Sequence, residues 1–197
     1  MFYAAHILNV AGSIQITSRR CNHEGIAIWG NNCRALHRVG RAKFFPGFIF
    51  PNYDQDAFED EYHDWLKPYF VDAESGRLLM SLHSYIIKTP KHTIIVDTCV
   101  GNHKHRPDTN AWHMKDGPFL NKMIAMGVAP ESVDFVMCTH LHVDHVGWNT
   151  KLEDGRWIPT FPNAKYLFHE DEYAHWETEE MSEGAGNTRR AAYEDSV

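Results

Sequence analysis

The sequence predicts a layered α/β fold of the α+β kind, in which helices pack against mixed sheets. Short apolar runs of strand length alternate with segments of helical periodicity along most of the chain, an order that is typical of layered folds. The apolar share of 43% and the aromatic share of 13% over 197 residues are sufficient for the core of one domain. No internal repeat or low-complexity tract interrupts this order.

The first predicted element is a short amphipathic helix over residues 54–66. This segment is acidic, and its aromatic residues Phe58, Tyr62 and Trp65 are spaced as one face of a helix requires. Pro68 follows two residues later and ends the predicted helix, because proline has no amide hydrogen to continue it.

A strand pair follows the helix. Residues 78–88 and 92–97 are apolar runs that predict two strands, and the turn between them contains Pro90. The second run ends in Asp97, so this carboxylate is expected at a strand end.

The remaining elements alternate between helix and strand. Residues 117–126 predict a helix that begins near a proline and is closed by Gly127. Residues 133–138 and 165–168 predict two further strands, and the acidic residues 171–180 predict a helix.

The charge distribution divides the chain near Phe44. Residues 1–50 carry a net charge of +5, whereas residues 51–197 carry −12. We therefore expect a basic segment over residues 1–43 and a folded domain over residues 44–197. The basic segment is open to three interpretations: a divergent strand pair, a basic appendage or an incorrect start. Its six scattered basic residues lack interleaved aromatics, and the acidic remainder repels phosphate, so no nucleic-acid partner is expected.

The cysteine pattern and hydropathy indicate the compartment. The four cysteines form no C-x-x-C pair and no disulfide framework, which favours a reducing, cytoplasmic location. No run of 18 apolar residues exists and the start has no basic region of a signal peptide, so no membrane partner is expected.

The chemistry-bearing motif is a loop at residues 139–147 that follows the strand predicted at 133–138. It places His140, His142, Asp144 and His145 within six residues, with Gly147 behind them. Imidazole nitrogen and carboxylate oxygen are the ligands that zinc prefers, and on an extended segment the first three of these side chains share one face. The sequence therefore predicts a metal site. The alternative is a histidine-rich surface turn whose rings cap backbone groups.

The motif H-x-H-x-D-H after an apolar strand and a threonine resembles the metallo-β-lactamase superfamily. The resemblance implies an αββα sandwich in which His140 and His142 bind one metal and Asp144 and His145 bind a second. Asp144 would also act catalytically by orienting the attacking hydroxide. Asp97 resembles the aspartate of the family's Asp-Thr-Gly strand end, which implies a hydrogen bond to a ligating histidine. The alternative is that Asp97 only caps the next turn.

Residues 81–87, 147–150 and 154–164 resemble the branch that includes acyl-homoserine lactonases and methyl parathion hydrolase. The resemblance implies a metal-bound hydroxide that attacks a lactone, ester or phosphotriester, and hence a small-molecule substrate. It implies zinc, with iron, manganese or cobalt also accepted by these ligand types, and it allows a homodimer. The alternatives are a non-catalytic fragment with weak metal binding, a thiolester hydrolase of the glyoxalase type, an iron dioxygenase and a nuclease.

The family completes its site downstream with a third histidine, a bridging carboxylate and a last histidine. After His145 the chain offers only His169 and His175, which are expected at the surface or in packing rather than as ligands. Residues 188–197 have helix formers with no terminating glycine, asparagine or proline, which reads as an interrupted helix. We therefore expect the N-terminal half of the sandwich and part of the second.

Several residues near the loop in sequence are candidates for the substrate pocket. The aromatic candidates, for which a core position is the default, are Trp112, Trp148 and Phe119. The histidines on the segment after Asp97, for which a solvated loop is the default, are His103, His105 and His113.

Overall fold

The computed structural model describes residues 33–36, 41–54, 56, 66–67, 69–178 and 186–197. These residues form two compact units, which are described separately. One unit contains the strand at residues 33–36 and the described residues from His83 onward, and the other contains the described residues between Arg38 and Leu82.

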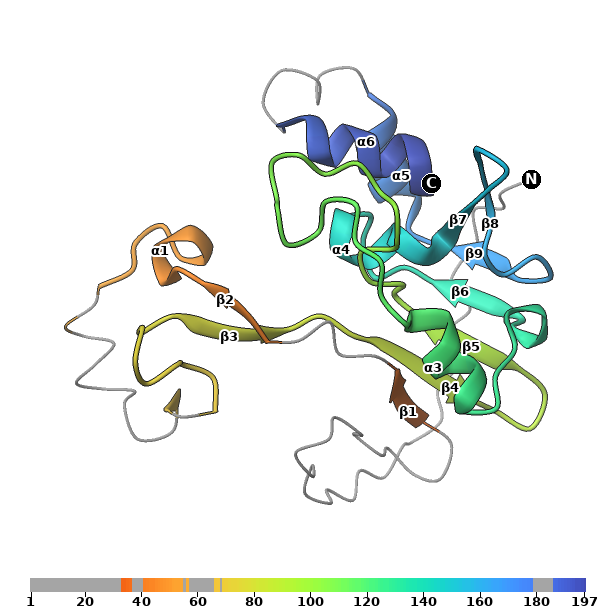
Figure 1. Ribbon diagram of the computed structural model, residues 1–197, viewed down its shortest axis with the longest axis horizontal. Helices are drawn as coiled ribbons and strands as arrows, with labels where there is room; N and C mark the ends of the chain where they lie inside the picture. The colour runs from red at the N-terminus through yellow and green to blue at the C-terminus, as the bar shows by residue number, and fades with distance from the viewer. Residues whose placement is uncertain (1–32, 37–40, 55, 57–65, 68, 179–185) are drawn as a thin grey trace. The chain divides into compact units, whose positions relative to one another are not determined.

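The larger unit is built on a sheet in which five strands of the described chain pair in the order β1-β4-β5-β6-β9 (Figure 1). Their bounds are β1 Cys33–Leu36, β4 Ser84–Lys88, β5 Thr93–Val96, β6 Phe135–Met137 and β9 Lys165–Leu167. β1, β4 and β5 are antiparallel neighbours, whereas β5, β6 and β9 run parallel. The carboxyl ends of the three parallel strands therefore meet at one edge.

Local sequence explains the connection between β5 and β6. Helix α3, Phe119–Ala125, buries Phe119 and Met123, which are four residues apart on one face. Gly127 follows with φ +75°, a conformation that glycine adopts without steric cost, and ends the helix. The short 3₁₀ helix η2, Pro130–Ser132, then leads into β6.

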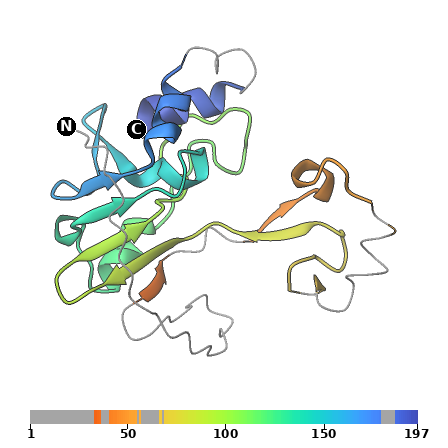
Figure 2. The ribbon, with the colours of Figure 1, turned by 180° about the vertical axis from the view of Figure 1, so that it is seen from behind.

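The chain between β6 and β9 contains α4, Val143–Val146, η3, Gly147–Asn149, and the hairpin of β7, Thr150–Glu153, with β8, Arg156–Pro159. Asp154 and Gly155 connect the two hairpin strands with φ of +50° and +76°, as a two-residue turn with two left-handed residues requires. Two helices follow β9, α5 at Glu170–Glu177 and α6 at Gly186–Ser196. α6 packs on α4 and η3 (Figure 2).

The smaller unit contains β2, Arg41–Phe44, α1, Pro46–Ile49, and β3, Leu78–Ser81. β2 and β3 pair antiparallel. An ion pair of 2.7 Å between Lys43 Nζ and Asp72 Oδ2 ties β2 to the turn that precedes β3.

The mixed α/β architecture confirms the predicted fold class. The predicted strands at 92–97, 133–138 and 165–168 and the helices at 117–126 and 171–180 correspond to β5, β6, β9, α3 and α5. The prediction of a single strand over residues 78–88 was wrong. The chain leaves the ladder at Leu82 and His83, so β3 pairs with β2 while β4 pairs with β1 and β5.

The strands β1, β7 and β8 were not predicted. β1 is short, and the sequence of the β7–β8 hairpin carries a turn signal but no clear strand pattern. Most of the predicted helix at 54–66 and most of the basic segment at 1–43 lie outside the described residues. No described helix is long and apolar enough to span a membrane.

Candidate metal centre

The candidate site lies at the carboxyl ends of β5 and β6, where parallel pairing sets two loops side by side. Val96 is in register with Met137, and the amide of Asp97 continues the ladder by donating to Met137 O at 2.9 Å. Asp97 therefore follows β5 at the point where Thr139 and the histidine loop follow β6. Loops at the carboxyl edge of parallel strands are a common place for functional residues.

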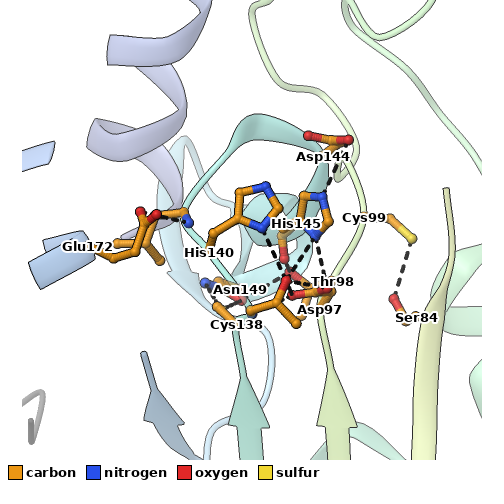
Figure 3. A network of polar contacts seen from close by, with 12 residues as sticks. Ser84, Asp97, Thr98, Cys99, Cys138, His140, Asp144, His145, Asn149 and Glu172 are labelled. Atoms are coloured by element: carbon orange, nitrogen blue, oxygen red, sulfur yellow. Dashed lines mark hydrogen bonds and ion pairs between the residues drawn. The ribbon is translucent and has the colours of Figure 1, made fainter. Parts of the chain in front are cut away.

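The Asp97 carboxylate is the centre of a hydrogen-bond network (Figure 3). Its Oδ1 accepts from the Thr139 amide at 2.8 Å and from Thr139 Oγ1 at 3.0 Å. Its Oδ2 accepts from His145 Nδ1 at 2.8 Å. The backbone of Asp97 is left-handed, with φ +55°, which turns the side chain toward the loop after β6.

His145 is held between two carboxylates. Its Nδ1 donates to Asp97, and its Nε2 lies 3.5 Å from Asp144 Oδ2. Since the Nδ1 proton is committed to Asp97, the ring presents Nε2 to Asp144 and to any ligand bound there. This is the orientation that a metal-ligating histidine takes when a carboxylate fixes its tautomer.

The pKa values of this trio follow from the same contacts. Burial alone would lower the pKa of His145, but hydrogen bonds to Asp144 and Asp97 outweigh burial and raise the pKa to about 9. Burial would raise the pKa of Asp97 and of Asp144, yet the hydrogen bonds from His145 prevail and lower both. The three shifts show that His145 and its two carboxylates stabilise one another's charged forms.

The other two histidines of the loop gather around His145. The His140 ring centroid lies 3.9 Å from that of His145 and 4.5 Å from that of His142. Burial and the neighbouring charge of His145 lower the pKa of His140. The His142 ring also meets the Trp176 ring edge to face at 5.5 Å.

Two glycines bring the two loops into contact. A Cβ on Gly147 would lie 1.9 Å from Val100 C, and a Cβ on Gly101 would lie 2.6 Å from Gly147 O. The Gly147 amide donates to Cys99 O at 2.7 Å, and the Thr98 amide donates to His145 O at 2.6 Å. The Asp97 loop and the histidine loop therefore touch backbone to backbone.

A buried polar cluster lies beneath the two loops, near the ends of the strands (Figure 3). Thr98 Oγ1 donates to Asn149 Oδ1 at 3.0 Å, and Asn149 Nδ2 lies 3.5 Å from Cys138 Sγ. Burial raises the pKa of Cys99 and of Cys138 to about 12, so both thiols stay protonated. The sequence reasoning missed Thr98 and Asn149, although Asn149 lies in the 147–150 stretch that carries the family resemblance.

Comparison with known proteins identifies the family. The sequence profile of the metallo-beta-lactamase superfamily matches residues 80–195, more than half of the chain. The chain belongs to the metallo-beta-lactamase superfamily. No curated protein matches it.

Solved structures of this superfamily and of metal-dependent hydrolases resemble the chain. The hydrolase AbOPH of the beta lactamase superfamily is 25% identical with a TM-score of 0.59, covering 84% of this chain and 54% of its own. A probable metal-dependent hydrolase from Staphylococcus aureus is 22% identical with a TM-score of 0.56, covering 73% and 48%. AidC, a dizinc quorum-quenching lactonase, is 16% identical with a TM-score of 0.56, covering 83% and 56%. The chain thus spans about half the length of these proteins.

Membership of the superfamily implies a metal cofactor, and the donors present fit one in part. Two ligands about 2.0–2.1 Å from a tetrahedral metal lie roughly 3.3 Å apart, and the 3.5 Å between His145 Nε2 and Asp144 Oδ2 approaches that spacing. Within the described part of the chain, no group of three or more histidine, cysteine or acidic side chains is close enough to hold an ion. In this geometry the superfamily motif therefore places one pair of ligand atoms, from Asp144 and His145, at a spacing that suits a metal ion.

The two later histidines lie apart from the loop contacts. His169 caps α5 by accepting from the Asp171 amide at 3.2 Å, and its side chain is exposed. His175 is exposed on the same helix.

Of the residues proposed for the substrate pocket, some lie in the core and others in the segment after Asp97. Phe119 and Trp148 stack at 5.3 Å in the core, whereas Trp112 is half-buried. His105 and His113 form a ring pair at 5.0 Å, and His103 Nε2 lies 4.0 Å from Asp116 Oδ1.

Proposed function

We propose that this chain provides the metal-binding loop of a hydrolase that acts on a lactone, ester or phosphotriester with zinc as its metal. The observation that carries the proposal is the placement of His145, whose Nδ1 is held by Asp97 at 2.8 Å while Nε2 faces Asp144 at 3.5 Å. A surface turn that only caps backbone groups has no need of a buried carboxylate on one ring nitrogen and a second carboxylate on the other.

The residues divide into ligands and a positioning group. His140 and His142 would hold one ion, Asp144 and His145 would hold the second, and Asp144 would also orient the nucleophile. Asp97 and Thr139 keep the His145 ring in place through the hydrogen bonds that they share. A divalent ion bound here supplies an acidified water and a Lewis acid for the acceptor oxygen.

The substrate class is proposed from the proteins of similar fold. AidC is a dizinc lactonase, and AbOPH is a hydrolase of the same superfamily. The lactonase activity of AidC supports a small-molecule substrate for this chain, and the net charge of −7 disfavours a nucleic acid. A homodimer remains the proposed assembly. A cytoplasmic location is supported by Cys99 and Cys138, which are free thiols in the interior.

A second candidate is a chain that binds metal weakly and turns over no substrate. It is favoured by the absence of any three-ligand group among the described residues. Two side chains provide fewer ligands than the three that a catalytic zinc site usually draws from the protein.

Hydrolysis assays distinguish the two candidates. The purified chain with zinc would be tested on an acyl-homoserine lactone, an aryl ester, an aryl phosphotriester and a glutathione thiolester. Asp144→Asn should abolish turnover, whereas the matched Asp154→Asn should retain it, because Asp154 lies exposed in the hairpin turn. Metal binding without turnover on every substrate supports the second candidate, and a chain that binds no metal contradicts both.

A further inference from the structure

Helix α5 begins at the carboxyl end of β9, the strand next to β6, and so borders the histidine loop. Glu172 and Trp176 are four residues apart and share one face of the helix. Trp176 is only 4% exposed, whereas its neighbours His175 and Glu177 are exposed. The face that carries Glu172 and Trp176 therefore packs inward.

One oxygen of Glu172 joins the helix to the loop. Glu172 Oε2 accepts from Trp176 Nε1 at 2.8 Å and from the Leu141 amide at 3.4 Å. Leu141 separates His140 from His142 in the sequence, and its side chain is 1% exposed. In Figure 3 the Glu172 side chain points toward the loop segment that carries His140. The carboxylate thus holds the peptide between the two histidines.

The indole completes the contact on the other side. The Trp176 ring meets the His142 ring at 5.5 Å and an interplanar angle of 85°, an edge-to-face arrangement. The hydrogen bond to Glu172 fixes the plane of the indole, since a charged acceptor makes a strong and directional bond. A fixed indole ring in turn restricts the rotation of the His142 ring.

We propose that Glu172 and Trp176 are positioning residues that set the peptide at Leu141 and the ring of His142 for metal binding. The inference rests on the proposed function and deepens it, because it assigns α5 a role at the metal loop. The proposal explains why an acidic side chain of α5 points toward the loop, where a solvated helix face would leave it in water.

Cobalt binding by the metal-free chain tests the proposal. Glu172→Ala, which removes the acceptor, should weaken the Kd for Co²⁺ by about 10–100-fold, the usual effect of losing a group that orients a ligand. Glu172→Gln keeps one oxygen acceptor and should recover most of that loss. Glu177→Ala on the exposed face is the matched control and should leave the Kd unchanged. Equal Kd values for Glu172→Ala and Glu177→Ala overturn the proposal.

A metal-free readout separates this inference from the proposed function. The indole ring current should shift the ring-proton NMR signals of His142, and Trp176→Leu should remove that shift. Trp176→Phe keeps an aromatic ring and loses the Nε1 donor, so it should reduce the shift without removing it. This variant serves as the test if the leucine variant does not fold.

The two readouts give distinct outcomes. His142 signals that move in the Trp176 variants, in a chain that binds no cobalt, would show that Trp176 orients the His142 ring but refute both its role in metal binding and the proposed function. Cobalt bound equally by every variant, with unmoved His142 signals, refutes positioning and leaves the proposed function standing.

Discussion

Gly147→Ala should separate the two loops that form the candidate metal centre. Gly147 has φ −58°, which any residue adopts, so the substitution adds no backbone strain of its own. The added Cβ would lie 1.9 Å from Val100 C, 2.2 Å from Val100 O and 2.3 Å from the Gly101 amide nitrogen. All three atoms belong to backbone, so the loops must move apart by about 1.5 Å to reach an ordinary contact.

The cost follows from the hydrogen bonds across this contact. Gly147 N donates to Cys99 O at 2.7 Å, Trp148 N donates to Thr98 O at 3.0 Å, and Thr98 N donates to His145 O at 2.6 Å. Lengthening each by about 1.5 Å takes it beyond hydrogen-bond range. At about 1 kcal/mol per bond, the variant should lose about 3 kcal/mol in the free energy of unfolding.

Urea unfolding of the metal-free chain measures this loss, and Gly155→Ala is the matched control. Gly155 has φ +76°, and a Cβ added there would have no atom within 4 Å, so its substitution tests the left-handed backbone alone. That cost is about 1–2 kcal/mol. Only Gly147→Ala should also weaken metal binding, because it displaces His145 from Asp97. A free energy of unfolding for Gly147→Ala within about 0.5 kcal/mol of the unsubstituted chain would refute the reasoning.

Three further predictions concern the supports of the site. Asp97→Ala should weaken metal binding by about 10–100-fold, measured by calorimetric titration, and an unchanged affinity would contradict its role. Lys104 is fully buried, and burial lowers its pKa from 10.5 to about 8. Between these two pH values the Lys104 side chain is protonated in the unfolded chain but largely neutral in the folded chain. The free energy of unfolding should therefore rise as the pH increases from about 8 to 10.5. The free energy of unfolding relative to Lys104→Met should grow by about 3 kcal/mol across that window, and a flat difference would refute the shift. Cys99 has φ +52°, so Cys99→Gly should be about 1 kcal/mol more stable than Cys99→Ala in thermal unfolding, and the reverse order would contradict this.

The sequence predicted the metal loop because its signal is local. An apolar strand followed by His140, His142, Asp144 and His145 depends only on residues that are close in sequence, and β6 forms where the pattern indicates. The extended segment expected after it was wrong in part, because Asp144 and His145 lie in the short helix α4. A hydrogen bond between Asp97 and one of the loop histidines was expected from the family resemblance, and in the structure His145 is its partner. Whether these residues ligate metal stays a prediction.

The supports were not predictable because they depend on distant segments. Gly101 and Gly147 touch only after β5 and β6 pair in parallel, and nothing in the local pattern of either glycine reveals that contact. Glu172 and Trp176 lie in an acidic segment that reads as a solvated helix, and their contacts require the placement of α5 beside the histidine loop. The break at Leu82 was hidden because both flanking runs are apolar and of strand length.

Elemental analysis of the purified chain after mild dialysis tests the central claim most directly, with His142→Ala measured in parallel. We predict at least one metal ion per chain, lost in the variant, because the loop at residues 140–145 provides the ligands. A chain without metal, or a variant that retains the same metal content, would contradict the assignment of this loop as the metal centre.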